Sequence, residues 1–189
     1  MDAFSYLSVL LSIIIGLSIT QVLQGYRGLL LNRASVALFA PSLIWSVLLI
    51  AFSTQLWWAS FGLADHSDWN FATFAVILIQ TVLLYMMSAL VLPDFANQKP
   101  IDLAAHYWNE VVPFFAITLA MLISSVGKDW MLTGRLPSPG NLAFHIGFAS
   151  IALLAIVSRR RLVHNAIAWV MVAFTGSYIA LMFARLGQS

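Results

Sequence analysis

Six long apolar runs constrain this chain more than any other feature. They extend approximately over Phe4–Gln24, Val36–Phe61, Phe71–Leu92, Tyr107–Val126, Asn141–Val157 and Leu162–Arg185. About 20 mostly apolar residues are enough to cross the hydrocarbon of a bilayer as a helix. Backbone groups in hydrocarbon must pair within a helix or a closed barrel, and the alternating pattern of barrel strands is absent. We therefore expect an all-α polytopic membrane protein, a bundle of six transmembrane helices forming one domain over residues 1–189.

The scarcity of charge supports this class. Only 8% of the residues are charged, whereas a typical soluble domain has about 25%. The lipid bilayer must then cover most of the surface. The chain has no cysteine, which excludes disulfides and thiolate chemistry. No basic surface interleaved with aromatic residues lies outside the apolar runs, so a nucleic-acid partner is not expected.

The positions of the basic residues predict an orientation, because short cytoplasmic loops carry an excess of Lys and Arg. One face collects the larger set, namely Arg27, Arg33, Lys99 and Arg159–Arg161, and the other collects Lys128, Arg135 and Arg185. We place the larger set in the cytoplasm, so that both termini lie outside, on the periplasmic side of a bacterial inner membrane. The first run lacks a basic N-terminal flank and is expected to be a retained span.

Two further expectations concern the ends and the middle of the spans. The segment Gly127–Gly140 carries Lys128 and Asp129 together with a Pro-Ser-Pro-Gly turn, and we expect it to be an outer loop that lies on the membrane. Trp45 and Trp169 lie deeper in their spans than the other tryptophans and are expected to be packing residues.

Small residues recur at four-residue intervals on two spans. The positions are Ser8, Ser12, Gly16 and Thr20 on the first span and Gly176, Ala180 and Ala184 on the sixth. Such positions share one stripe of a helix, and small residues let another helix approach closely within lipid. Packing inside the six-helix bundle is the favoured interpretation, and a seam between copies in an oligomer is the alternative.

The longest polar break, Pro93–Glu110, contains Asp94, Asp102, His106 and Glu110. The last three are four residues apart and would share one face of a helix that starts near Pro100. Near that N-terminus, the helix dipole stabilises Asp102. One interpretation is a proton or ion route through His106 and Glu110, and another is a metal site that adds Asp94. The plainer interpretation is a helix start at the membrane surface whose acids pair with neighbouring arginines.

Polar residues within the spans are the other candidates. They are Gln21, Gln55, Gln80, Tyr85 and His145. An unpaired amide in hydrocarbon is costly, so these side chains predict either a ligand pocket or hydrogen bonds between helices. Axial haem ligation by the pairs His106–His164 or His66–His145 is an alternative, although neither pair lies deep. Catalytic and dinucleotide-binding motifs are absent, so we expect no catalytic residues, no metal and no cofactor.

Short motifs carry a resemblance. The stretches YLSVL at 6–10, QLWW at 55–58 and LPD at 92–94, followed by Asp102-Leu103 and His106-Tyr107, resemble a group of small, uncharacterised bacterial membrane proteins with six spans. The resemblance covers nearly the whole chain and implies the fold and the bacterial inner membrane. It implies no activity and no site residues.

These observations give two functional expectations. The first is a small transporter, a channel-like protein or an accessory subunit, working as a homo-oligomer or inside a larger membrane complex. The alternative is a membrane-embedded redox or metal-dependent enzyme subunit that uses haem or a divalent metal through His106 and Glu110 or through His145.

Overall fold

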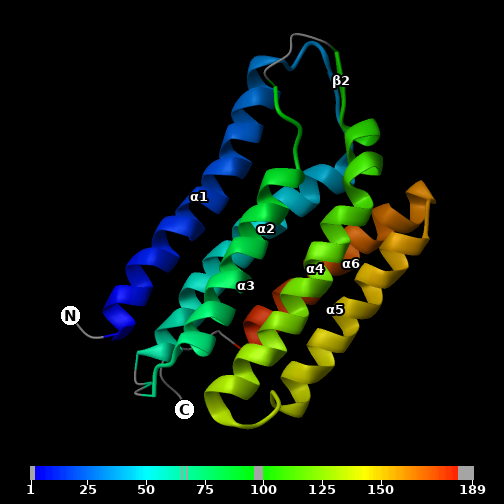
Figure 1. The fold of residues 1–189 in the computed structure, drawn as a ribbon. Helices are drawn as coiled ribbons and strands as arrows, with labels where there is room; N and C mark the ends of the chain where they lie inside the picture. The colour runs from blue at the N-terminus through cyan, green and yellow to red at the C-terminus, as the bar shows by residue number, and fades with distance from the viewer. Residues whose placement is uncertain (1–2, 65, 67, 96–99, 183–189) are drawn as a thin grey trace.

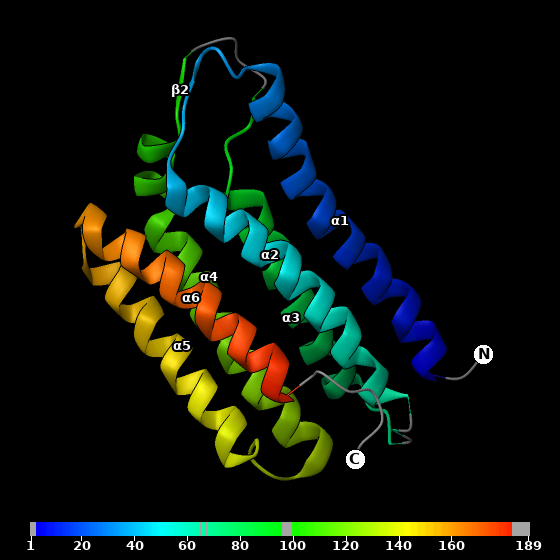
Figure 2. The same ribbon diagram turned by 180° about the vertical axis from the view of Figure 1, so that it is seen from behind.

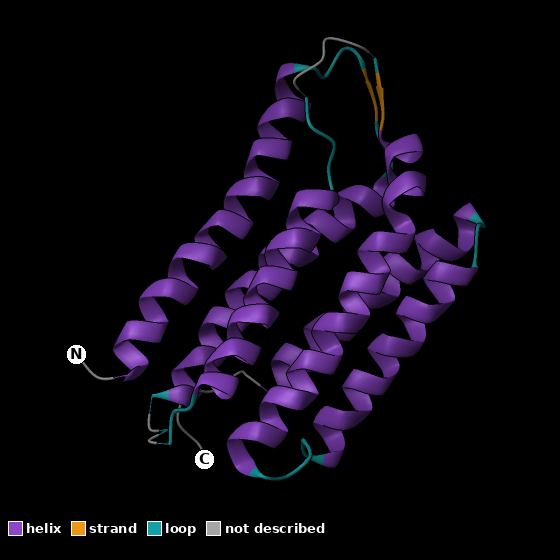
Figure 3. Ribbon diagram, viewed as in Figure 1, coloured by secondary structure: helices purple, strands orange, loops and turns teal. Residues whose placement is uncertain are grey.

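The computed structural model describes residues 3–64, 66, 68–95 and 100–182, and this part of the chain forms six long helices (Figures 1 and 3). They are α1 (Ala3–Leu31), α2 (Ala40–Ala59), α3 (Phe71–Leu90), α4 (Leu103–Thr133), α5 (Pro139–Val157) and α6 (Arg161–Met182), with the short elements β1 (Val36–Ala37), η1 (Ser60–Leu63) and β2 (Ile101–Asp102) between them. All six are long and apolar enough to cross a membrane. The predicted all-α, six-helix fold is thus confirmed, and the helices indicate an integral membrane protein.

Successive helices run in opposite directions, so α1 starts and α6 ends at the same end of the bundle (Figures 1 and 2). Helices α3, α4, α5, α6 and α2 contact one another in that order, and α2 returns to α3, which closes a ring. Helix α1 lies outside this ring and packs against α2 and α3. The ring therefore encloses an interior into which side chains project.

The two ends of the bundle differ in charge. One end carries Arg27, Arg33 and the turn Arg159–Arg161, and we call it the arginine end. There β1 pairs in parallel with β2 in the register Val36 to Ile101, which ties the α1–α2 connection to the α3–α4 connection. The other end contains η1 and the α4–α5 loop, and we call it the η1 end. Which end faces the cytoplasm stays a prediction, and Lys99 and Arg185 lie outside the described residues.

Helix α4 is longer than its apolar run predicts. It continues through Gly127 to Thr133, so the expected surface loop is shortened to residues 134–138. Gly134 ends the helix in the left-handed region, with φ of 67°, and its N–H donates to the Trp130 carbonyl at 2.8 Å. A helix of 31 residues is about 46 Å long, whereas the hydrocarbon core measures about 30 Å. Helical structure therefore carries Lys128 to the η1 end.

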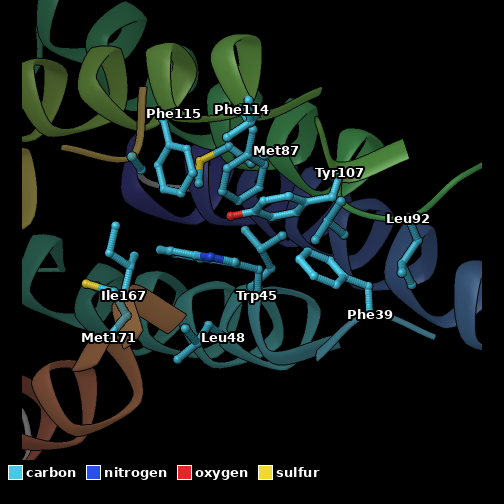
Figure 4. Close-up of a cluster of buried hydrophobic side chains, with 14 of the residues drawn as sticks. Phe39, Trp45, Leu48, Met87, Leu92, Tyr107, Phe114, Phe115, Ile167 and Met171 are labelled. Carbon is cyan, nitrogen blue, oxygen red and sulfur yellow. The ribbon is translucent and has the colours of Figure 1, made fainter. Parts of the chain in front are cut away.

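The half of the ring near the arginine end is filled by aromatic side chains around Trp45 (Figure 4). Trp45 is fully buried and meets the rings of Phe114 and Phe115 edge to face at 5.4 and 5.2 Å. Trp169 does not pack in the core as expected, because 64% of it is exposed. Helix α6 turns its neighbours Ile167 and Met171 inward, which places Trp169 on the outer face.

The small-residue stripes also face outward. A side chain at Gly16 or Gly176 would meet no other atom within 4 Å, and Ser12, Thr20 and Ala180 are exposed while Ser8 is partly buried. The larger residues Leu7, Leu11 and Ile15 form the inner face of α1 instead. Packing within the bundle, the interpretation favoured from sequence, does not account for Gly16 and Gly176, although the Ser12 hydroxyl accepts from Nε1 of Trp57 on α2 at 3.4 Å. The oligomer seam stays a prediction, and Ala184 lies outside the described residues.

Glycines nearer the arginine end make the close contact of α1. A Cβ at Gly25 would lie 2.5 Å from Cδ1 of Leu92, and one at Gly28 would overlap the Phe95 ring. Both contacts reach the segment that follows α3. Glycine is required at these two positions because a larger residue would push α1 away from that segment.

We expect Gly28→Ala to lower the free energy of unfolding by about 1–3 kcal/mol, the usual cost of forcing extra volume into a packed contact. The Phe95 ring must move to admit the methyl group. Unfolding by SDS in mixed micelles, followed by tryptophan fluorescence, measures the change. Gly16→Ala is the matched control on the same helix, because its methyl group meets empty space. Equal loss of stability in both variants would contradict the contact.

Candidate binding cavity

The half of the ring near the η1 end holds a cavity of about 320 Å³. Its lining runs along α4 from Thr118 to Leu132, a length of about 21 Å at 1.5 Å per residue. The exposed Gly62 of η1 lies on the lining at the η1 end, so the cavity extends to the surface there. Small-molecule sites typically have about 300–1,000 Å³, and this cavity falls at the lower limit of that range.

Three of the five intramembrane polar residues singled out from the sequence line this cavity. They are Gln55 from α2, Gln80 from α3 and His145 from α5. The other two, Gln21 and Tyr85, lie between α1 and α3, where the Gln21 amide donates to the Tyr85 hydroxyl at 3.0 Å. The two polar candidates on α3 thus lie on different faces of the helix, because Gln80 lines the cavity while Tyr85 bonds to Gln21 of α1.

Two polar atoms in the cavity wall have no hydrogen-bond partner among the described residues. They are Oε1 of Gln80 and Oγ1 of Thr175, and both residues are at least 95% buried. The other threonines of the wall are satisfied, since Thr81 donates to the Ile77 carbonyl and Thr118 to the Phe114 carbonyl, each at 2.9 Å. Most buried polar side-chain atoms in proteins have a partner. Gln80 Oε1 and Thr175 Oγ1 are exceptions, and each has less than 1 Å² of accessible surface.

A set of hydrogen bonds surrounds the part of the cavity near the η1 end. His145 donates through Nδ1 to the Asn141 carbonyl at 2.9 Å, which leaves Nε2 to accept from the Ser125 hydroxyl at 3.1 Å. The Tyr178 hydroxyl donates to Oδ1 of Asn141 at 3.2 Å. These bonds join α4, α5 and α6. His145 is therefore held by its neighbours and is not free to act as a metal or haem ligand without losing them.

The charges on the lining neutralise each other. Lys128 and Asp129 form an ion pair at 3.7 Å. The remaining lining residues carry amide, hydroxyl, imidazole or apolar groups. The apolar wall contains four phenylalanines, namely Phe52, Phe144, Phe148 and Phe174, together with a larger number of Leu, Ile and Met side chains. The cavity is consequently a largely apolar space with a few hydrogen-bonding groups and no net charge.

The cavity does not continue to the arginine end. Beyond Met87 and Thr118, the ring interior is occupied by Trp45 and Phe115, both fully buried. A second space, of about 10 Å³, lies between Trp45 and Glu110, which is about the minimum for one water molecule. The described residues therefore form a one-ended cavity and not a continuous pore.

The polar stretch Pro93–Glu110 lies at the arginine end, away from the cavity. Asp102 caps α4 by accepting from the Ala104 N–H at 2.8 Å. Nε2 of His106 lies 3.0 Å from the Leu90 carbonyl near the end of α3, so this histidine ties the two helices together. Glu110 is partly buried beside the small space just described, and Asp94 is exposed. The contacts of Asp102 and His106 are those of a helix start held by hydrogen bonds, and they do not indicate a ligand-binding site.

The structure does not assemble the metal site considered from the sequence. Within the described ranges, no group of three or more His, Cys, Asp or Glu side chains is placed to hold a metal ion. The proposed ion route is not connected either, because Val111 and Phe114 line the space beside Glu110 and the large cavity begins beyond the aromatic core. His106 and Glu110 thus do not share a site with Gln80.

The arginine end also contains a buried histidine, His164, whose burial the sequence did not predict. His164 is fully buried, and its Nε2 donates to the Ser158 carbonyl at 2.9 Å. Its Nδ1 accepts from the Tyr107 hydroxyl at 2.7 Å. Because three arginines precede it, the sequence suggested a surface position. Its place in the first turn of α6, four residues before the inward Ala168, is the signal that indicates burial.

The sequence did not predict that serine hydroxyls from three helices would meet. Ser18 on α1 lies 2.7 Å from the Ser88 hydroxyl on α3 and 3.3 Å from the Ser53 hydroxyl on α2. All three are buried. Interhelical hydrogen bonds of this kind stabilise membrane bundles, and here they fix α1 in the groove between α2 and α3.

Comparisons with known protein families, with curated proteins and with solved structures find no match to this chain. The resemblance drawn from the short motifs therefore stays an expectation. Function has to be argued from the cavity itself.

Proposed function

We propose that this protein is a small-solute transporter and that the structure represents its state accessible from the η1 end. The observation that carries the proposal is the cavity of about 320 Å³ inside the helix ring, with Gln80 and Thr175 as unpartnered polar groups in its wall. A site enclosed by several helices near the middle of the bundle is where transporters bind their solutes. Three of the polar residues in the spans, Gln55, Gln80 and His145, line this one cavity.

The closed half of the ring favours a transporter over a channel. A channel needs a continuous path lined by groups that replace hydration, and Trp45 and Phe115 fill that path here. Transporters instead expose one site to each side in turn, by movement of helices around it. The aromatic core near the arginine end acts as the closed gate in this proposal.

Accessibility of a single cysteine tests the proposal, and the chain has no native cysteine to add background. Met121 is partly buried and lines the cavity, so Met121→Cys reports on the site. We expect a membrane-impermeant thiol reagent to label it from either face of oriented vesicles, because a transporter visits both states. Labelling from the arginine end should be the slower of the two, since that state requires the aromatic core to separate.

Two further cysteines calibrate the faces. Ser60→Cys on the rim at the η1 end and Ser35→Cys, exposed at the arginine end, should each react from one face only. Labelling of Met121→Cys only from the face that labels Ser60→Cys would show that the site never changes sides. The protein would then be a binding protein and not a transporter.

A further inference from the structure

We infer that the cavity takes an uncharged amphiphile with a single aliphatic chain, the chain pointing toward the aromatic core and a hydroxyl-bearing head lying beside Gln55. The inference rests on the proposed function and names its substrate class. Three features of the cavity carry it. They are the change from carbon to polar groups along its length, the unbonded amide of Gln55, and the length of its apolar part.

The inner part of the cavity, nearest the aromatic core, offers mainly carbon to a ligand. The hydroxyls of Thr81 and Thr118 bond to carbonyls of their own helices. Oε1 of Gln80 and Oγ1 of Thr175 each have less than 1 Å² of accessible surface, so neither is open to a ligand. The remaining side chains at this depth are apolar, namely Phe52, Met87 and Phe148. Burial of an aliphatic chain against such a wall is favourable.

The outer part of the cavity, at the η1 end, is polar. It contains the ion pair of Lys128 with Asp129 and the hydrogen bond from the Tyr178 hydroxyl to Asn141. The next residue of α4, Trp130, is 59% exposed, and tryptophan is enriched at the interface between membrane and water. The outer part therefore lies at the level of the lipid head groups. From its opening to its inner end, the cavity repeats the polarity of one bilayer leaflet.

Gln55 supplies the contact for the head. It is half-buried, lines the cavity from α2, and its amide makes no hydrogen bond within the described ranges. Phe52, three residues earlier, belongs to the inner part, and Ala59, four residues later, belongs to the outer part. Unlike Oε1 of Gln80, the amide of Gln55 is not sealed in the wall. An amide both donates and accepts, so it can bond to a hydroxyl in either direction.

The lining favours a head without charge. Lys128 and Asp129 already neutralise each other, and both ring nitrogens of His145 are engaged. A charged head beside Gln55 would lose hydration without gaining a counter-charge, which is unfavourable. A hydroxyl loses less hydration and can regain a hydrogen bond from the amide.

The apolar part has room for one chain of medium length. Along α4, Ser125 lies about 10 Å and Lys128 about 15 Å beyond Thr118. An extended hydrocarbon advances about 1.3 Å per carbon, given C–C bonds of about 1.5 Å. The chain should therefore have about eight to twelve carbons. The volume of about 320 Å³ agrees, because it is roughly ten times the 30 Å³ of one liquid water and a methylene group is nearly as large.

Photocrosslinking tests the orientation of the chain. The probes are two forms of 1-decanoylglycerol, one with a diazirine at the chain end and one with a diazirine beside the ester, added to the protein in nanodiscs of two-chain lipids. We expect saturable crosslinks from the chain end to Met87, Thr118 or Phe148, and from the ester side to residues 125–129. Mass spectrometry of the peptides identifies the sites.

Competition against the chain-end probe tests the class, with every competitor at the same mole fraction in the nanodisc so that partition into lipid is equal. 1-Hexanoylglycerol is too short to cover the apolar wall, and 1-octadecanoylglycerol exceeds its length. Methyl decanoate lacks the hydroxyl, and decanoate is charged. We expect each of these four to compete about tenfold more weakly than 1-decanoylglycerol. Didecanoylphosphatidylcholine, a two-chain lipid, should not compete.

Gln55→Leu keeps the size of the side chain and removes the amide. We expect it to weaken competition by 1-decanoylglycerol about tenfold and to leave competition by methyl decanoate unchanged. A merely structural role of Gln55 would alter both competitors alike. Gln21→Leu is the matched control, because its amide lies outside the cavity and already bonds to Tyr85. It should change neither competitor.

Several results would overturn the inference. They are crosslinks without saturation, chain-end crosslinks in the outer part, equal competition at all chain lengths, competition by the two-chain lipid, or an unchanged response in Gln55→Leu. Labelling of Met121→Cys without amphiphile is independent of these probes. Labelling from both faces without saturable crosslinks would reject the substrate class and leave transport standing. The expected crosslinks with labelling from one face would retain the ligand class and reject transport.

Discussion

Replacing Trp45 with alanine should lower the free energy of unfolding by about 3 kcal/mol. The side chain is fully buried and packs against Phe114, Phe115 and Phe148. Removing a buried tryptophan from a soluble core costs about 3–5 kcal/mol. We expect the lower value here, because the unfolded helices remain in lipid and the loss is mainly of packing contacts. The indole also plugs the ring, so its removal joins the large cavity to the space beside Glu110.

Trp169→Ala is the matched control for this substitution. It removes the same side chain from a spanning helix at a position that is 64% exposed, so the change in stability should stay within about 0.5 kcal/mol. SDS titration in micelles measures both variants. In oriented vesicles, Trp45→Ala should in addition speed labelling of Met121→Cys from the arginine end. Similar stabilities for the two tryptophan variants would contradict the packing described for Trp45.

The second large effect is expected for His164→Leu, which should cost about 2 kcal/mol. The substitution leaves the Tyr107 hydroxyl and the Ser158 carbonyl without their partner. An orphaned buried group costs about 1–3 kcal/mol in soluble proteins, and interhelical hydrogen bonds in membranes are worth about 0.6–1.7 kcal/mol. Two such groups at the lower values account for the estimate. The loss should appear in unfolding titrations, and labelling of Met121→Cys from the η1 end should be unchanged because His164 does not line the cavity.

A double-mutant cycle isolates the bond between His164 and Tyr107. Tyr107→Phe alone removes one partner, and the double variant Tyr107→Phe with His164→Leu leaves only the Ser158 carbonyl unpaired. We expect the double variant to lose less stability than the two single variants together, with a coupling of about 0.5–1 kcal/mol. Strict additivity would show that the two side chains do not interact.

The spans could be predicted because their signal is length and apolarity, which any bilayer imposes. The face of each helix that turns inward could not be predicted. A helix that is apolar on all sides gives no periodicity to indicate its buried stripe. That is why Trp45 and Trp169 look equivalent in the sequence yet lie in the core and on the surface. It is also why Gly16 seemed a packing residue while Gly28 makes the contact.

The cavity was predictable in part for a related reason. Gln55, Gln80 and His145 stand out because polar groups are rare in spans, and the structure brings all three to one cavity. Thr175 does not stand out, since threonine in a helix commonly bonds to a carbonyl one turn earlier, as Thr118 does. Only the three-dimensional structure distinguishes a threonine whose hydroxyl bonds to its own helix, such as Thr118, from one whose hydroxyl has no partner, such as Thr175.

The pairing of β1 with β2 has a mechanical consequence. Val36 lies opposite Ile101, and the Ile101 N–H donates to the Ser35 carbonyl at 3.0 Å. The start of α2 and the start of α4 are therefore tethered to each other at the arginine end. The η1 end has no such tether among the described residues. We therefore expect α2 and α4 to separate more readily at the η1 end than at the arginine end. Exposure of the cavity at the arginine end demands a different motion, in which the two tethered helix starts move as one body.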